Sequence, residues 1–185
     1  MKAKQNNISL SEIFPKSFLI YKLKLLKRFN NTHKITEESV LEHTTMVSLI
    51  SLLIAEKLNI KNKEKILKMS LFHDIPETLI SDIPHNVKKL YPEINKILAK
   101  IEPKALENIF PKDVEILKEY NECKTIDSKI VTLADYISVM IYCSIEIKLG
   151  NTLMRQVYTE ATFRYKQLCK ELNISILEEE ILVFN

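Results

Sequence analysis

Glycine is nearly absent from this sequence, with a single copy among 185 residues, at position 150. The tight turns of β-hairpins need residues at positive φ, which glycine supplies most readily and Asn or Asp less often. A chain with one glycine is therefore a poor candidate for an all-β fold. Leu, Ile, Lys and Glu dominate instead, and most of these favour helices, Ile less than the others. We predict an all-α fold.

The length of the chain fits a single domain over residues 1–185. A protein of this size buries roughly 70% of the surface that its unfolded chain exposes, so it needs no disulfides to form a core. The apolar fraction of 46% is ordinary for a globular protein. We expect one hydrophobic core. The last helices of the domain are expected over residues 151–185.

Charge and cysteine content limit the partners and the compartment. The 27 basic and 24 acidic residues are interspersed, so the net charge of +3 indicates an ordinary solvated surface and does not favour nucleic-acid binding. Cys123, Cys143 and Cys169 match no zinc-binding spacing, and an odd number without a secretory leader indicates reduced thiols. The longest apolar stretch, Val47 to Ala55, is too short to span a bilayer. We expect a cytoplasmic protein without a membrane segment.

Apolar periodicity and terminal signals predict helices throughout the chain. Ser39 and Glu42 have the spacing of a capping box at the start of the second helix. Arg28 is expected to end the first helix, Pro103 to break the middle of the chain, and Gly150 to stop the long helix. No segment is a confident strand. The expected helices cover about residues 16–29, 39–58, 62–74, 93–101, 103–120 and 122–149, with one or two more over 151–185.

Two of the four histidines lie where core residues are expected. His43 and His73 share helix faces with apolar residues, Asp74 follows His73, and Asp135 lies on the apolar face of the long helix. A lone core histidine is usually structural, and a lone Asp near a helix end is usually a cap or an ion-pair partner. Buried carboxylates are costly without a counter-charge, however. A divalent cation would neutralise them and accept neutral imidazole nitrogens, so the combination favours a metal site.

The order of these residues resembles that of the HD-domain phosphohydrolases, and within them the bacterial 5′-deoxynucleotidase branch. A histidine, then His-Asp, then Asp on separate helices is the metal signature of that superfamily. The resemblance covers most of residues 28–151, which would form the metal-site core of a single HD-domain helical bundle. The matching stretches are Arg28-Phe29, ESVLEHT (38–44), LFHDIPETLISDIPHNVKK (71–89) and SKIVTLADYISVMIYCSIEIKLGN (128–151).

The resemblance implies that one divalent metal ion is bound by a set of two imidazoles and two carboxylates. Such a mixed set suits Mn, Co, Fe or Ni in octahedral geometry, and Mg and Zn are also compatible. The sequence does not choose among these metals. The implied ligands are His43, His73, Asp74 and Asp135.

Further polar residues match catalytic positions of the resembling enzymes. Glu77 matches a carboxylate that positions or deprotonates the water activated by the metal, the alternative being a surface Glu. Asp82 matches a second acid that protonates the leaving ribose oxygen, and the two carboxylates could exchange tasks. Arg28 matches an arginine that contacts the substrate phosphate, although a helix C-terminus alone would also explain it. Lys88 either assists the phosphate or is a solvated lysine.

Phe29 departs from the resemblance, because the bacterial deoxynucleotidases carry a tryptophan that helps to shape the sugar pocket. Phenylalanine keeps an apolar plane but loses bulk and the indole N–H. The departure weakens the expectation of a preference for deoxyribose. Glu146, Gly150 and Asn151 match the end of the long helix in the resembling enzymes, and we interpret them as structural.

The resemblance implies a phosphoric monoester hydrolase that releases phosphate from nucleoside 5′-monophosphates, especially deoxy ones. One alternative keeps the metal site and changes the substrate to a cyclic nucleotide, a triphosphate or an alarmone, but those enzymes mostly carry further motifs or a second metal. Another is a non-catalytic regulatory module that binds metal or nucleotide, against which Glu77 and Asp82 argue. A homodimer is also implied. The segments TLMRQVYTEATF and ILVF near the C-terminus are candidates for its interface, or they cap the core of their own subunit.

Overall fold

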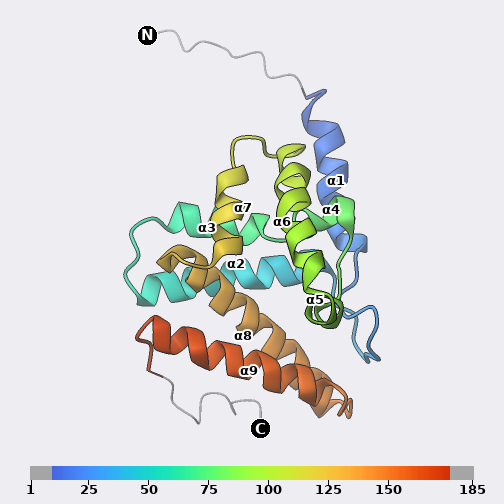
Figure 1. The fold of residues 1–185 in the computed structure, drawn as a ribbon, viewed down its shortest axis with the longest axis vertical. Helices are drawn as coiled ribbons and strands as arrows, with labels where there is room; N and C mark the ends of the chain where they lie inside the picture. Colours follow the sequence, from blue (N-terminus) through green and yellow to red (C-terminus); the bar gives the residue numbers. More distant parts are fainter. Residues whose placement is uncertain (1–9, 176–185) are drawn as a thin grey trace.

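The computed structural model describes residues 10–175, and these form an all-α bundle, as predicted. In Figure 1, α8 and α9 lie side by side in the lower half, and α2 crosses the middle of the molecule. Helix α2 packs against α3 and α8. The helices are α1 (Ile13–Leu25), α2 (Val40–Lys57), α3 (Lys63–Phe72), α4 (Glu77–Ile80), α5 (His85–Leu90), α6 (Pro92–Glu107), α7 (Val114–Glu122), α8 (Ile126–Lys148) and α9 (Met154–Glu171).

Capping signals explain where the two helices of the site begin and end. The predicted capping box of α2 is confirmed, because Ser39 Oγ accepts a hydrogen bond from the Glu42 amide and Glu42 accepts one from the Ser39 amide. Thr125 and Ser128 form a second box at the start of α8, which was not predicted because Ser replaces the usual Glu or Gln. Gly150, at φ 101°, ends α8 as predicted in a Schellman arrangement.

Two predicted helix boundaries are wrong. Helix α1 ends at Leu25 and not at Arg28, because Leu26 is extended and the chain then pairs with the start of α2. The Val40 amide donates to the Leu26 carbonyl at 2.9 Å, and the Arg28 amide donates to the Glu38 carbonyl at 3.0 Å. These bonds replace the last turn that the periodicity predicted.

Pro103 does not break the middle of the chain, since α6 continues through it to Glu107. A proline in a helix removes one backbone hydrogen bond and crowds the preceding turn. Leu98 before the proline and Leu106 after it are both buried, so packing of one continuous apolar face outweighs that cost. Pro76 lies in the turn that separates two helices, since α3 ends at Phe72 and α4 begins at Glu77.

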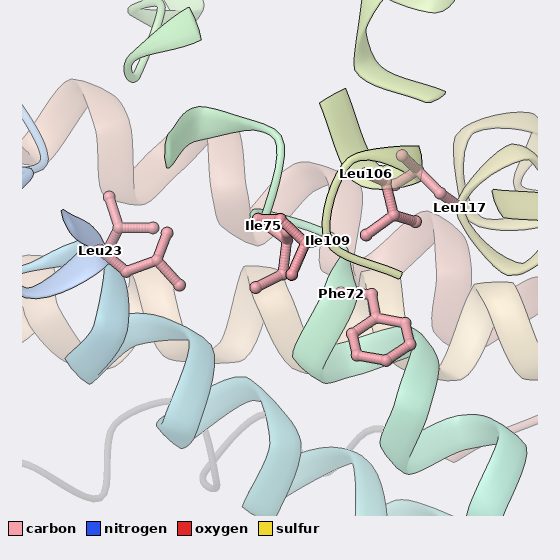
Figure 2. Packing of buried hydrophobic residues seen from close by; sticks show 7 residues of the cluster. Leu23, Phe72, Ile75, Leu106, Ile109 and Leu117 are labelled. Carbon is pink, nitrogen blue, oxygen red and sulfur yellow. The ribbon is translucent and has the colours of Figure 1, made fainter. Parts of the chain in front are cut away.

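The hydrophobic core includes two clusters that border the site described below. Figure 2 shows the first, in which α1, α2, α6, α7 and the end of α3 meet. The second joins α2, α3 and α8 through Val47, Met69 and Ala134, which are completely or almost completely buried. These clusters fix the relative positions of α2 and α8, which carry His43 and Asp135, and of α3, which leads into the turn with His73 and Asp74. The members of the first are Leu23, Val40, Phe72, Ile75, Leu106, Ile109 and Leu117.

Helix α8 differs from the sequence prediction in one respect. Among the described helices it alone is long and apolar enough to cross a membrane, although the expectation of no membrane segment was based on Val47 to Ala55. Half of its most apolar window is buried inside the protein, where it packs against α2 and α9. Its apolar composition is therefore that of a core helix.

Glu146 near the end of α8 is a completely buried carboxylate with a full set of donors. It accepts hydrogen bonds from the backbone amides of Ile35 and Thr36 at 2.8 and 2.6 Å, and from the Asn151 side chain at 2.8 Å. Burial raises the pKa of Glu146, but these bonds outweigh burial and hold the pKa at about 2, below the ordinary 4.5. Glu146 thus anchors the loop before α2 to α8, in the structural role that the sequence suggested.

We predict that Glu146→Gln destabilises the protein in a pH-dependent way. Because the folded pKa lies below the unfolded pKa, the carboxylate stabilises the fold above about pH 4.5, and this is lost as the pH falls toward 2. The pH-dependent part of the difference from the wild type should be about 3 kcal/mol at pH 7. Urea unfolding of both proteins between pH 7 and pH 2.5 measures it. Glu107→Gln, at an exposed site, should show no such trend. A difference that stays constant with pH would contradict the assignment.

Candidate metal centre

His43 is the first of the predicted ligands along the chain, one turn after the cap of α2. Its backbone amide donates to the Ser39 carbonyl at 3.1 Å, so the capping box sets where the ring projects. The side chain is buried, and its Nε2 atom lies 3.0 Å from Asp135 Oδ1 on α8. The start of α2 thereby determines the position of a ligand that faces α8.

His73 and Asp74 lie in the turn between α3 and α4. His73 Nδ1 donates a hydrogen bond to the Ser70 carbonyl at 2.6 Å, which leaves Nε2 to face the interior of the site. Nε2 lies 3.1 Å from Asp74 Oδ2, which is also 3.8 Å from His43 Nε2. The turn ahead of Pro76 therefore supplies one imidazole and one carboxylate to the same point.

The structure brings all four predicted ligands together. One ligand atom each from His43, His73 and Asp135 lies within 4.8 Å of the others, and Asp74 lies beside both rings. Within the described residues, the buried atoms His73 Nε2 and Asp135 Oδ1 make no hydrogen bond of good geometry, although Asp74 Oδ2 and His43 Nε2 lie only 3.1 and 3.0 Å from them. Two unsatisfied buried lone pairs that converge on one point are the surroundings a divalent cation requires. The residues present therefore fit a metal ion.

Charges in the cluster balance each other only in part. Burial raises the pKa of Asp74, but His73, His43 and Arg28 outweigh it and hold that pKa far below its usual range. For His73, burial alone would lower the pKa, but the carboxylates of Asp74 and Asp135 outweigh burial, so the pKa of His73 is raised above its ordinary value. The site thus favours positive charge near its carboxylates, which either protons or a cation can supply.

Glu77 and Asp82 form the acidic side of the site. Glu77 is the first residue of α4, and burial together with the charges of Asp74 and Asp82 raises its pKa to about 10. Burial also raises the pKa of Asp82, which Arg28 and Lys88 partly offset. The charges that act on these groups include those of Asp74 and His43, so both carboxylates lie near the predicted ligands.

Arg28 lies outside any helix, so the helix-dipole explanation for it does not apply. Its Nη1 atom donates to Glu38 Oε2 and to His43 Nδ1, each at 2.8 Å. The guanidinium also lies over the Phe29 ring, 5.1 Å from its centroid. Phe29 in turn stacks on Tyr142, with centroids 4.9 Å apart and an angle of 4° between the rings. Arg28 and Phe29 are thus held beside the candidate ligands.

Sequence reasoning missed two residues that touch this centre. Ser138 Oγ lies 3.1 Å from His43 Nδ1, and Glu38 holds Arg28. The spacing of Ser138, three residues after Asp135, places it on the same face of α8 and could have indicated it. Glu38 lies within the stretch ESVLEHT, where only Ser39, Glu42 and His43 were given roles.

Comparisons with known proteins agree with this arrangement. The family model of YfbR-like 5′-deoxynucleotidases matches residues 17–182. A 5′-deoxynucleotidase of Vibrio cholerae is 28% identical over 178 residues, covering 88% of this chain and 86% of the relative. A solved protein of Pyrococcus horikoshii has a TM-score of 0.76 at 26% identity, covering 92% and 97% of the two chains. The cyanophage S-2L HD phosphohydrolase DatZ shares the fold, with a TM-score of 0.65 at 17% identity and coverage of 91% and 90%.

We predict that Asp135→Asn weakens Mn²⁺ or Co²⁺ binding by at least about 100-fold, beyond the 10- to 100-fold typical of changes outside the ligand set. Isothermal titration of the metal-free protein measures this. Asp127→Asn is the matched control, since both carboxylates are on α8 with similar side-chain exposure, 25% for Asp135 and 20% for Asp127. Equal affinities of the two variants would show that the metal, if it binds, is held elsewhere.

Proposed function

This chain belongs to the YfbR-like 5′-deoxynucleotidase family, and from that membership we propose how it hydrolyses nucleoside 5′-monophosphates. The family confirms the prediction of a nucleotide phosphohydrolase. The observation that carries the proposal for this site is the convergence of the unsatisfied His73 Nε2 and Asp135 Oδ1 beside Glu77, Asp82 and Arg28. The proposed products are a nucleoside and inorganic phosphate.

We propose one divalent ion, held by His43, His73, Asp74 and Asp135. When bound, it would supply Lewis-acid activation of a phosphate oxygen and of the hydrolytic water. The proposal of a single ion is supported by the DatZ structure, which was solved with dA and one catalytic Zn²⁺ ion. Mn, Co, Fe, Ni, Mg and Zn all suit this ligand set, and the assay below compares Mn, Co, Mg and Zn.

The protein groups around that ion divide the rest of the reaction. Glu77 orients the water and, in its ionised form, accepts the water's proton; a cation held beside it would favour that ionised form. Arg28 stabilises charge on the equatorial phosphate oxygens, and Lys88 assists it. The water oxygen bonds to phosphorus, the bond from phosphorus to the 5′ oxygen breaks, and Asp82 donates a proton to that oxygen.

The sugar is proposed to lie against Phe29. Its ring is fixed between the Arg28 guanidinium and Tyr142, whose hydroxyl donates to the Thr36 carbonyl at 2.8 Å. An apolar wall at this position would favour the less polar 2′ carbon of a deoxyribose, as far as a phenylalanine can replace the larger tryptophan. The comparison of deoxy and ribo substrates in the assay addresses this preference.

We predict metal-dependent phosphate release from nucleoside 5′-monophosphates, abolished by EDTA and lowered about 10²- to 10⁴-fold in kcat by Glu77→Gln. The assay measures inorganic phosphate from ribo- and deoxyribonucleotides with Mn, Co, Mg or Zn. Metal affinity should be unchanged in Glu77→Gln, because Glu77 is not a proposed ligand. Glu93→Gln, also in the first turn of a helix but exposed, should behave as the wild type. No release with any of these metals, from folded protein that binds them, would reject the monophosphatase.

We also propose that the protein is a cytoplasmic homodimer. A cytoplasmic location is supported by the three cysteines, all of which are free thiols in the structure.

The homodimer is supported by a stripe of exposed apolar side chains on α1, whose opposite face packs into the core through Leu23. The sequence offers two C-terminal segments as candidates for the dimer interface. In TLMRQVYTEATF, Met154 and Ala161 are buried in the core of their own subunit, and ILVF lies outside the described residues. The stripe consists of Phe14, Phe18, Tyr21 and Leu25, each more than half exposed.

We predict that Phe18→Glu separates the dimer into monomers, because burying a carboxylate in an apolar interface is costly. Sedimentation velocity over a range of concentrations measures the association. Phe163→Glu on α9 is the matched control, with Phe18 66% and Phe163 61% exposed. Dissociation by Phe163→Glu alone would place the interface on the C-terminal helices, and a monomeric wild type would reject the dimer.

A further inference from the structure

Three side chains surround the ring nitrogen of His43 that faces away from the candidate metal centre. His43 Nδ1 lies 2.8 Å from Arg28 Nη1 and 3.1 Å from Ser138 Oγ. Arg28 Nη1 also lies 2.8 Å from Glu38 Oε2, and both members of this ion pair are largely buried. One ring nitrogen of one ligand therefore joins the metal centre to the arginine proposed to bind phosphate.

The contact with Arg28 determines which nitrogen of the ring carries the proton. A guanidinium only donates hydrogen bonds, so His43 Nδ1 must accept, and the neutral ring then carries its proton on Nε2. In that tautomer Nε2–H faces Asp135 Oδ1, 3.0 Å away. A nitrogen that carries a proton has no lone pair to offer a cation.

A cation on Nε2 requires the opposite tautomer, with the proton on Nδ1. Ser138 can remain beside Nδ1 in either case, because a hydroxyl both donates and accepts. Arg28 cannot, because two N–H groups would then face each other. His73 offers no such choice, since its Nδ1 is bound to the Ser70 carbonyl, which only accepts. Among the two imidazole ligands, His43 alone can alternate.

We propose that His43 Nδ1 couples occupancy of the metal centre to the position of Arg28, and that Ser138 and Glu38 are positioning residues for this exchange. With the cation in place, Ser138 accepts the Nδ1–H bond, and Arg28 is released from His43 while Glu38 keeps the guanidinium at the site. Arg28 is then available to a substrate phosphate. This inference rests on the proposed function for the role of Arg28, but the exchange itself does not depend on turnover.

Ring ¹⁵N NMR at pH 8 tests the exchange directly, with Zn²⁺ as a diamagnetic probe. The chain has only four histidines, which makes the spectrum tractable. His43 should carry its proton on Nε2 in the metal-free protein and on Nδ1 after Zn²⁺ is added, whereas His73 Nδ1 stays protonated throughout. A His43 ring with its proton on Nδ1 in both forms would overturn the proposal.

The Zn²⁺ affinities of two variants provide a second test, because one change should weaken Zn²⁺ binding and the other should strengthen it. Ser138→Ala should weaken binding about 10- to 100-fold, and Ser138→Thr should restore it. Removing the ion pair by Arg28→Ala/Glu38→Ala keeps the net charge and abolishes the competing bond, so affinity should rise about 3- to 10-fold. Ser48→Ala is the control, because Ser48 is 4% and Ser138 2% exposed and Ser48 bonds only within α2.

The outcomes separate this inference from the proposed function. A double variant with weakened Zn²⁺ binding, at an unchanged melting temperature, would show that the ion pair supports the metal site and would overturn the exchange. The exchange would stand, and the proposed substrate would fall, if the tautomer changes with Zn²⁺ but no nucleoside monophosphate is hydrolysed. Loss of Zn²⁺ binding in Ser138→Ala but not in Ser48→Ala would support the positioning role.

Discussion

Two carboxylates that face two imidazoles inside an apolar bundle impose the constraint on which the site depends. Asp74 and Asp135 approach His43 and His73 from different elements. Both carboxylates are mostly shielded from solvent, so water does not fully stabilise their negative charge. Leaving such groups unsatisfied would cost several kcal/mol, so the arrangement persists only if positive charge is supplied. The clusters that join α2, α3 and α8 provide the packing that holds the groups together in advance.

The segment between α1 and α2 links this constraint to the proposed phosphate contact of Arg28. The buried Glu146 ties Ile35 and Thr36 to α8, and the bridge between Lys27 and Ser39 ties the other end to the start of α2. Arg28 is carried on this anchored loop, with its carbonyl bound by Lys34 at 2.8 Å. A loop fixed at both ends can place a guanidinium accurately without the support of a helix, which suits a phosphate contact.

The sequence predicted the all-α fold because helix formation and helix ends follow from local rules, whereas the candidate ligands were identified through the resemblance to the HD-domain phosphohydrolases. A capping box fixed the start of α2 and hence the register of His43, and Gly150 marked the end of α8. It could not predict that Pro103 stays inside α6, because tertiary burial of Leu98 and Leu106 decides that balance. Nor could it place Arg28, whose conformation depends on pairing with residues beyond the loop.

Contacts across the fold were the hardest to foresee. Ser138 meets His43 although 95 residues separate them in the chain, and only its spacing from Asp135 on α8 points to this contact. The exposed stripe of α1 was equally hidden, because its periodicity is the same as that of the buried face containing Leu23. Periodicity shows that a face is apolar, but only packing shows what covers it.

Anomalous diffraction from crystals grown with Mn²⁺ or Zn²⁺ tests the central claim most directly. The account predicts one strong peak per chain, with His43 Nε2, His73 Nε2, Asp74 and Asp135 at coordination distances of about 2.0–2.3 Å. A peak bound by other residues, or no peak between these four side chains at saturating metal, would contradict it.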